Sequence, residues 1–374
     1  MKILVAPNSY KESLNSIEVA RHIAAGLRKA SRKIRIAEVP LADGGTGTAQ
    51  IITKAFDGEF KKKEVIGPLD KKVAAMYGVI PHQRVAVVEL AEAAGLDLVP
   101  KGKRNPLITS TKGVGELIQD AISNRYRKII LGIGDSATID CGVGALSVLG
   151  ARFLNHANKE IELNCRGLLG LQKVDASILY KRLKRVKITI ASDVKNILTG
   201  RYGALVYARQ KGAKQKMLPT IRKALANFKK VILNQYGTDL DRIPGSGAAG
   251  GIGGAFHAIL GAEILSGFGL VQGMVRLEEE IKTSDLVITG EGRIDKESFY
   301  GKTLKRVIDM AYIHKKPVIL IAGSITQDAK IFNKYGVIQQ YSLLKSSKST
   351  QKAMRNAPKL LERLAYTIGK TIIP

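Results

Sequence analysis

Six short apolar runs recur along the chain, and the segments between them carry the spacing of helices. Each run is four to six residues long and is rich in β-branched residues. Continuous apolar runs of this length are typical of strands buried on both faces, as in a parallel sheet. Their alternation with helical segments, clearest over 16–29 and 110–124, predicts an α/β fold with helices on both faces of the sheet. The expected strands are residues 3–6, 85–88, 129–132, 186–191, 286–289 and 318–322.

The length of the chain bears on its domain organisation. A chain of 374 residues predicts roughly two or three domains. Apolar residues make up 45% of it, which is enough for a sizeable core in each domain. No proline- or serine-rich linker separates the expected strands. One domain inserted into another is therefore as plausible as two domains in tandem.

Glycine-rich and small polar loops follow most of the expected strands. Ligands of open parallel sheets bind beyond the carboxyl ends of the strands, so we expect the chemistry in such loops. A related loop over 40–48 places Asp43 before three glycines and an expected helix over 48–55. Glycines let backbone N–H groups approach an anion, and a helix N-terminus favours negative charge. The alternative is a flexible turn. The glycines are Gly44, Gly45 and Gly47.

Two further loops also leave two interpretations open. In 132–144, Ser136 and Thr138 offer hydroxyl donors at a strand end, or else they cap a helix. In 243–256 the glycines either hold phosphate or allow close helix packing. This loop matches G-x-G-x-x-G but is not a dinucleotide fingerprint, because no strand precedes it and no acid lies in 264–277. Its motif glycines are Gly245, Gly247 and Gly250, and the stretch 245–262 is expected to be a buried helix.

Asp193 follows an expected strand and lies in a strongly basic part of the chain. Residues 173–230 contain sixteen lysines and arginines against two acids, Asp175 and Asp193. A carboxylate surrounded by positive charge stays ionised at neutral pH. It could accept a proton from a substrate hydroxyl or bind a metal. The alternative is a solvated ion pair.

Glu291, Arg293 and Asp295 alternate shortly after the strand expected over 286–289. Two carboxylates beside an arginine suit a magnesium–phosphate site, in which the acids hold the metal and the guanidinium contacts phosphate oxygens. The nearby Gly-Lys-Thr over 301–303 is not a P-loop, because position 296 holds a lysine where that motif requires glycine.

Several other classes of protein are disfavoured. The five histidines lack the spacing of zinc ligands, and no apolar window is long enough to span a membrane. Cys141 and Cys165 make no disulfide framework, which favours a cytoplasmic protein. The net charge of +28 raises nucleic-acid binding as an alternative. Aromatic residues are only 5% of the chain, however, and no basic motif is interleaved with them.

Nine short stretches stand in chain order between residues 6 and 324. They are APNSYKESL (6–14), ADGGTGT (42–48), GIGDSATIDCGVG (132–144), SDVKNILTG (192–200), ARQKGA (208–213), PGSGAAGGIGGA (244–255), DLVITGEGRID (285–295), GK (301–302) and KPVILIAGS (316–324). Together they resemble the bacterial glycerate kinases of the tartronate-semialdehyde and glycolate pathways, an ATP-dependent family unrelated to P-loop kinases. One stretch alone says little, but nine in order are specific. The chain departs from the usual family pattern at Asn8, Thr46, Asp135, Lys195 and Ile197.

The resemblance implies a fold and a reaction. The fold is two α/β domains with largely parallel, Rossmann-like or flavodoxin-like sheets, one inserted into the other, with the active site in the cleft. We expect residues 1–68 and 283–374 in one domain and 69–282 in the inserted one. The reaction is ATP-dependent phosphorylation of D-glycerate to 2-phosphoglycerate with Mg²⁺, by a monomer or homodimer with no specific nucleic-acid or membrane partner. A kinase for another small hydroxy acid remains an alternative.

The resemblance and the strand-end positions together predict roles for individual residues. Asp193 is the general base or orients the substrate hydroxyl. Lys11 and Arg293 bind the substrate carboxylate or the transferring phosphoryl group. Asp43, Glu291 and Asp295 contact Mg²⁺ or a hydroxyl, with Glu291 and Asp295 the metal candidates. The anion-binding loops are shaped by Ser136 and by Gly44, Gly45, Gly47, Gly245, Gly247 and Gly250.

Overall fold

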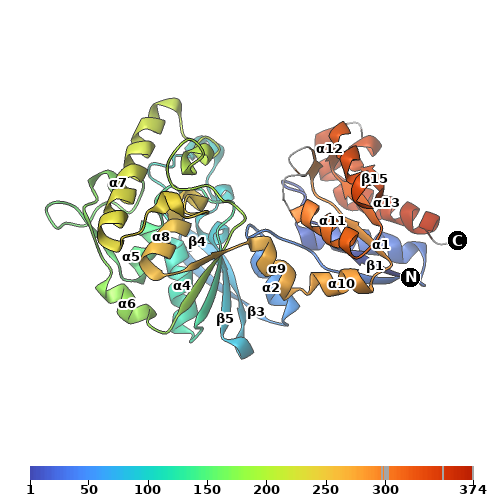
Figure 1. Cartoon of the computed structure of the whole chain (residues 1–374), viewed down its shortest axis with the longest axis horizontal. Coiled ribbons are helices and arrows are strands. Elements are labelled where there is room, and N and C mark those ends of the chain that lie inside the picture. Colours follow the sequence, from blue (N-terminus) through green and yellow to red (C-terminus); the bar gives the residue numbers. More distant parts are fainter. Residues whose placement is uncertain (296–297, 299–302, 348, 373–374) are drawn as a thin grey trace. The chain divides into compact units, whose positions relative to one another are not determined.

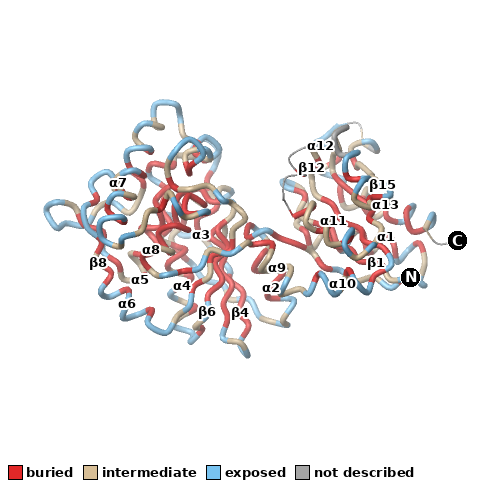
Figure 2. The backbone as a smooth tube through the Cα atoms, viewed as in Figure 1, coloured by how far each residue is buried: buried red, intermediate tan, exposed pale blue. Residues whose placement is uncertain are grey.

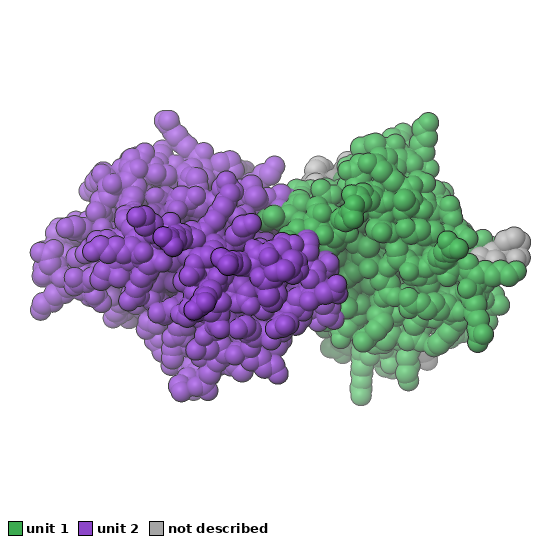
Figure 3. Space-filling view, turned by 90° about the horizontal axis from the view of Figure 1, so that it is seen from below, with its two compact units in different colours: residues 1–42, 268–374 green, residues 43–267 purple. Residues whose placement is uncertain are grey.

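The chain folds as two compact units, drawn in different colours in Figure 3. The first unit combines residues 1–42 with 268–374, and the second is continuous over 43–267. The second unit is therefore inserted into the sequence of the first. The computed structural model describes residues 1–295, 298, 303–347 and 349–372.

The first unit is built around a parallel sheet of five strands in the order β15-β13-β11-β1-β2. Figure 1 labels two of its strands, β1 and β15. These are β1 (Lys2–Val5), β2 (Arg35–Glu38), β11 (Leu286–Thr289), β13 (Val318–Ala322) and β15 (Val337–Ser342). A separate parallel pair joins β12 (Arg293–Ile294) to β14 (Ser324–Ile325). The helices are α1 (Ser16–Ala30), α9 (Gly267–Met274), α10 (Leu277–Thr283), α11 (Thr303–Ile313), α12 (Thr350–Arg355) and α13 (Ala357–Ile372).

Both faces of this sheet are buried. Ile3 and Val5 of β1 belong to a core that includes residues of α1 and α13, whereas Leu4 belongs to a second core with α10 and α11. Successive side chains of a strand point to opposite faces, so a continuous apolar run supplies both cores. The central strands are accordingly coloured as buried in Figure 2.

The second unit has a six-stranded sheet in the order β10-β9-β6-β5-β4-β3. The strands β10, β9, β6 and β5 are parallel, and β4 and β3 extend the sheet in antiparallel fashion. The strands are β3 (Glu59–Ile66), β4 (Lys72–Ile80), β5 (Val85–Glu89), β6 (Lys128–Gly132), β9 (Lys187–Ala191) and β10 (Glu263–Leu265).

Helices and a small hairpin complete the second unit. The hairpin pairs β7 (Arg152–Leu154) with β8 (Lys173–Asp175). The helices are α2 (Thr48–Ala55), α3 (Leu90–Ala94), α4 (Lys112–Ser123), α5 (Val143–Leu149), α6 (Ser177–Leu183), α7 (Leu218–Tyr236) and α8 (Ile252–Leu260).

The fold confirms the α/β class with mostly parallel sheets. All six expected strands are present, each within one residue of its expected ends. The strand β3 is among those that were not expected from the sequence, and its composition shows why. Its sequence EFKKKEVI is dominated by charged residues, and only Val65 in it is buried. A strand at the edge of a sheet needs little apolar surface, so it leaves no apolar run in the sequence.

The boundaries between the two units differ from the expected ones. They were expected at 68/69 and 282/283, and the structure has them at 42/43 and 267/268. Strand β3 pairs with β4 along its whole length, from Glu59 to Ile66, and so lies in the second unit. Helix α10, over 277–283, packs in the core of the first unit instead.

The expected buried helix over 245–262 forms only from Ile252 onward. Ala249, Gly250 and Gly251 adopt φ angles of 53°, 74° and 99°. Three consecutive residues in this left-handed region cannot continue a right-handed helix. Among the residues that the structure describes, no helix is long and apolar enough to cross a membrane.

Candidate functional site

The carboxyl edge of the second unit's sheet is covered by the loop that joins the two units, residues 43–48. The N–H of Gly134, just after β6, donates to the Gly44 carbonyl at 3.1 Å. Gly44 has a φ of +93°, and a Cβ there would lie 2.4 Å from the carbonyl oxygen of Ala191, the last residue of β9. A side chain at this position would collide with β9. Glycine thus lets the loop lie directly across the ends of two parallel strands.

Two carboxylates fasten this loop. The N–H and Oγ1 of Thr46 both donate to Oδ2 of Asp135, at 3.2 and 2.9 Å. The N–H groups of Gly47 and Ala49 donate to the two carboxylate oxygens of Glu89, the last residue of β5, at 3.2 and 2.6 Å. A protein carboxylate therefore already occupies the N-terminus of α2, which the sequence suggested for a ligand anion.

Glu89 is 4% exposed, and burial raises the pKa of its carboxyl to about 7. The two N–H donors oppose this shift, while the charges of Glu92 and Asp135 reinforce it. A buried carboxyl held by two backbone donors is a structural anchor whose charge changes near neutral pH. Glu89 was not singled out from the sequence, although it directly follows the expected strand 85–88.

Ser136 forms a buried pair with Lys211 at the same edge. Nζ of Lys211 donates to Oγ of Ser136 at 2.6 Å and to the Thr138 carbonyl at 2.8 Å. Lys211 is 3% exposed, and burial lowers the pKa of its amine to about 7, against a smaller opposing effect from Asp140. Because the Ser136 oxygen accepts from Lys211, its own hydrogen is directed elsewhere.

Neither Ser136 nor Thr138 caps a helix, because α5 begins at Val143 after Gly142. Ser136 therefore keeps the role of hydroxyl donor that the sequence left open. Lys211 was not singled out by sequence reasoning, although it lies within the stretch ARQKGA. Residues 173–230 contain sixteen lysines and arginines, and nothing in the sequence indicates which of them is buried.

Asp193 directly follows Ser192 after β9, and Ser266 follows β10. The hydroxyl of Ser266 donates to Oδ1 of Asp193 at 2.5 Å. Since β9 and β10 are parallel neighbours, their carboxyl ends bring these side chains together. The pairing fixes one oxygen of the carboxylate at the edge that also carries Ser136 and the 43–48 loop.

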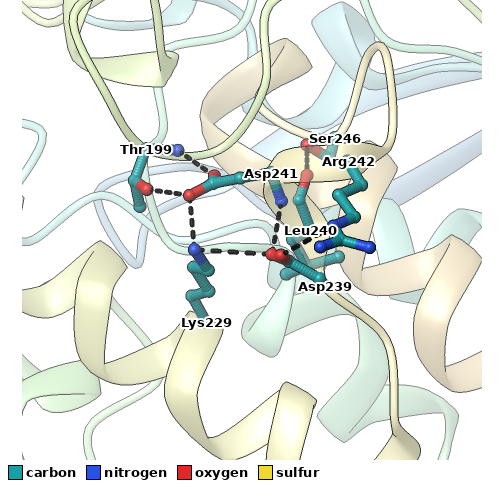
Figure 4. A network of polar contacts seen from close by, with 7 residues as sticks. All are labelled: Thr199, Lys229, Asp239, Leu240, Asp241, Arg242 and Ser246. Carbon is teal, nitrogen blue, oxygen red and sulfur yellow. Dashed lines mark hydrogen bonds and ion pairs between the residues drawn. The ribbon is translucent and has the colours of Figure 1, made fainter.

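A polar network fastens the segment that follows Asp193 to helix α7 (Figure 4). The N–H of Thr199 donates to Oδ1 of Asp241 at 2.8 Å, and its hydroxyl donates to Oδ2. Lys229 of α7 contacts Oδ2 of Asp241 at 2.6 Å and Asp239 at 3.4 Å. Burial acts to raise the pKa of Asp241, but the donors Lys229 and Thr199 outweigh it and the pKa lies below its ordinary value.

The glycine-rich loop 244–251 is held to the same segment by close packing. A Cβ on Gly247 would lie 2.1 Å from the Ile197 carbonyl oxygen, and one on Gly250 would lie 2.2 Å from that of Thr138. A Cβ on Gly245 would lie 3.1 Å from the Ile264 side chain. Of the two interpretations left open by the sequence, the structure favours close packing for these glycines.

In the first unit, the loops after β1 and β11 lie against each other. The N–H of Asn8 donates to the Gly290 carbonyl at 2.8 Å. A Cβ on Gly292 would lie 3.2 Å from the backbone nitrogen of Lys11. The structure thus brings the backbone of Lys11 beside the 290–295 loop, which carries Glu291, Arg293 and Asp295.

Within that loop, Nε of Arg293 contacts Oδ2 of Asp295 at 3.1 Å. Arg293 is exposed, and Glu291 is half-buried. The hydroxyl of Tyr10 donates to the Ile321 carbonyl at 2.6 Å, and burial followed by the charge of Glu291 raises the pKa of Tyr10 well above its usual range. Glu291 therefore lies near the buried Tyr10.

The side chains of the 290–295 loop would supply only part of the coordination shell of a magnesium ion. Across the described part of the chain, no group of three or more histidine, cysteine or acidic side chains is placed to hold a metal. Mg²⁺ bound with a nucleotide usually takes only one or two carboxylates, with phosphate oxygens and waters completing its shell. The 290–295 loop carries two carboxylates, Glu291 and Asp295, which is the number that this smaller role requires. Residues 301–302, one of the nine stretches of the resemblance, lie outside the described residues.

Each unit thus collects its own share of the predicted residues. Asp43, Gly44, Gly45, Gly47, Ser136 and Asp193 gather at one edge of the second unit. Lys11, Glu291, Arg293 and Asp295 gather at the corresponding edge of the first. The fold and these loops define an α/β protein of two units, each with its polar loops at the carboxyl ends of parallel strands.

Comparison with known proteins names the family. The sequence profile of the glycerate kinase family matches residues 3–373. The chain is 41% identical to a glycerate 2-kinase of Escherichia coli K12 over 373 residues, covering 100% of this chain and 98% of that protein. It is 39% identical to a glycerate kinase of Bacillus subtilis 168 with the same coverages. The chain belongs to the glycerate kinase family.

A solved crystal structure supports the fold. It is of a protein from Salmonella typhimurium LT2 that carries the assignment glycerate kinase 2. It superposes with a TM-score of 0.84 at 39% identity, covering 100% of this chain and 98% of that one.

Proposed function

We propose that this protein transfers the terminal phosphoryl group of ATP to D-glycerate and that the product is 2-phosphoglycerate. Membership of the glycerate kinase family supports the substrate, and the similarity to a glycerate 2-kinase supports the position of transfer. The observation that carries the proposal is the position of Asp193. It lies at the carboxyl edge of a parallel sheet, beside Ser266 and on the same edge as Ser136.

Asp193 acts as general base or orients the hydroxyl of glycerate. Ser266 holds Oδ1, and an ionised carboxylate has further capacity to accept hydrogen bonds. It can therefore take the proton of the substrate hydroxyl as the new P–O bond forms. Transfer to a hydroxyl depends mainly on positioning and on charge stabilisation, so it requires no covalent enzyme intermediate.

Ser136 contributes a hydroxyl donor to the anionic reactants. Lys211 donates to its oxygen at 2.6 Å, which leaves the Ser136 hydrogen to point to an acceptor such as a carboxylate or phosphoryl oxygen. In the first unit, Lys11 and Arg293 supply positive charge for the same classes of anion. Glu291 and Asp295 would hold Mg²⁺, which neutralises phosphate charge when bound.

The proposal also includes a cytoplasmic location. Cys141 and Cys165 are both buried and unbridged. Free thiols of this kind fit a reducing compartment.

The test is an assay of purified protein with ATP, Mg²⁺ and D-glycerate. Coupling through enolase reports 2-phosphoglycerate, and adding phosphoglycerate mutase reports 3-phosphoglycerate as well. We expect activity with enolase alone. Signal only after the mutase is added would overturn the position of transfer, and activity confined to another hydroxy acid would overturn the substrate.

Asp193→Asn tests the mechanism. Losing a positioned base should lower kcat by about 10²–10⁴-fold, while the shape of the side chain is kept. Asp97→Asn, an exposed aspartate of the same unit, is the matched control and should retain wild-type turnover. An Asp193→Asn turnover within about threefold of wild type, far short of the loss a positioned base predicts, would remove Asp193 from this role.

A further inference from the structure

The amino edge of the second unit's sheet, opposite the edge that carries Asp193, bears a cluster of arginines. Arg84 directly precedes β5, and Arg127 directly precedes β6. Arg185 lies two residues before β9, and Arg125 lies in the turn that leads to β6. All four line a single cavity of about 500 Å³. We call these four residues the arginine cluster.

Backbone hydrogen bonds hold the three turns of the cluster together. The carbonyl of Arg84 accepts from the N–H groups of Arg127 and Lys128, at 3.0 and 3.2 Å. The carbonyl of Arg127 accepts from the N–H of Lys187 at 2.8 Å. These bonds continue the ladders of three adjacent parallel strands, so the cluster is built on a rigid element.

Two of the arginines stand on unusual backbone. Arg84 has a φ of 53° and Arg125 a φ of 67°. This left-handed region costs free energy for any residue but glycine, and long side chains adopt it uncommonly. Two turns that glycine would suit therefore carry arginine instead, at positions that share one cavity.

The charge of the cluster is not neutralised locally. Among the described residues, no acidic one lines the cavity. Within the described part of the chain, none of the four arginines takes part in an ion pair. The neighbouring Asp120 is engaged by Lys63 at 3.0 Å and by the Tyr77 hydroxyl at 2.7 Å. Like charges gathered without a counterion repel one another, and a bound anion relieves this repulsion.

One arginine is fixed, and three are open to solvent. Nη1 of Arg127 donates to the carbonyls of Ile122 and Tyr126, at 2.9 and 3.0 Å, and the residue is half-buried. The other three members of the cluster are exposed. Guanidinium groups present paired N–H donors that match the oxygens of a phosphate, and they are weakly hydrated compared with ammonium groups.

We propose that the arginine cluster is a binding site for a small phosphate-bearing anion, either a polyphosphate or a phosphorylated metabolite. The cavity is within the range of volumes that hold small ligands. A nucleic-acid strand is the less suitable occupant, because base stacking needs exposed aromatic side chains. Tyr126 is the one aromatic residue in the described lining of the cavity, and it is 8% exposed.

The experiment measures binding of inorganic pyrophosphate by titration calorimetry, without Mg²⁺ and at constant ionic strength. The test variant is Arg84→Gln with Arg185→Gln. The control removes the same charge elsewhere, with Arg166→Gln and Arg363→Gln, two exposed arginines that do not line the cavity. Any pyrophosphate bound by the proposed catalytic loops is common to all three proteins. The difference between them therefore reports the arginine cluster.

We expect the test variant to lose one equivalent of bound pyrophosphate, or to bind it at least about tenfold more weakly, since two charge-assisted contacts are removed. The control variant should bind like wild type. Glycerate phosphorylation by the test variant should stay within about twofold of wild type, because the cluster is remote from the proposed catalytic edge. Absence of kinase activity in all three proteins would refute the proposed function and leave this binding result interpretable.

Equal pyrophosphate binding by wild type and test variant would overturn the proposal, as would an equal loss in the control. The proposal would also be overturned, in favour of a nucleic-acid surface, by a wild type that binds duplex DNA but not pyrophosphate, if the test variant binds DNA more weakly and the control variant does not. If the double variant fails to fold, Arg185→Gln alone serves, because its backbone is not in the left-handed region. An unchanged affinity in that single variant would count against the proposal.

Discussion

The buried carboxyl of Glu89 makes a quantitative prediction about stability and pH. Its oxygens accept from Gly47 and Ala49 at the start of α2, and the residue is 4% exposed. The perturbation is Glu89→Gln, which keeps the size and one acceptor but removes the titration. The substitution also turns an amide N–H₂ toward a backbone donor, which lowers stability by an amount that does not depend on pH.

The size of the pH effect follows from the shifted pKa. The folded-state pKa is about 7 against an ordinary value of 4.5. At about 1.36 kcal/mol per unit, this difference corresponds to roughly 3 kcal/mol. Because the folded protein holds the proton more tightly, the contribution to stability is full below pH 4.5 and is lost as the pH rises to about 7.

The assay is urea unfolding followed by circular dichroism at several pH values between 5 and 7. Relative to Glu89→Gln, the free energy of unfolding of the wild type should fall by about 1.4 kcal/mol for each pH unit. Glu59→Gln, an exposed glutamate of the same unit, is the matched control and should track the wild type. Parallel pH dependences for wild type and Glu89→Gln would refute the argument, since Glu89 would then titrate as it does in the unfolded chain.

Three further predictions concern packing, the buried amine and the thiols. Gly250→Ala places a Cβ 2.2 Å from a backbone oxygen at a φ of +74°, so it should lower the free energy of unfolding by at least about 2 kcal/mol in a urea titration. A Cβ on Gly102 meets no described atom within 4 Å apart from its chain neighbours, so the control Gly102→Ala should be nearly neutral. Burial lowers the pKa of Lys211 from 10.5 to about 7, so between pH 7 and 10 the unfolded chain holds a proton that the folded protein lacks. The free energy of unfolding of the wild type should therefore rise with pH relative to that of Lys211→Met. Equal pH dependences of the two proteins would contradict the burial of this amine. Burial raises the pKa of Cys165 to about 12 and raises that of Cys141 as well, so neither thiol should react with Ellman's reagent at pH 8 until the protein is unfolded, and one equivalent of reaction in the native protein would count against their burial.

The class of fold, the six central strands and the family could all be predicted from the amino-acid sequence. Continuous apolar runs record burial on both faces of a sheet, because each successive residue of such a strand enters a core. The loops after those strands carry the glycines and acids in chain order, and that order is visible without a structure. Asp193 and Ser136 were both predicted in this way, and the structure places both at the carboxyl edge of the second unit's sheet.

The residues that contact these loops could be identified only from the three-dimensional structure. Nothing in the sequence distinguishes Glu89 from other glutamates or Lys211 from other lysines. The burial that shifts the pKa of each side chain is produced by residues that are distant in the chain. The arginine cluster likewise joins turns that are far apart in sequence, because parallel strands bring their amino ends to one edge. The boundary between the units depends on β3, a charged strand whose place is fixed by pairing with β4 and not by its own pattern.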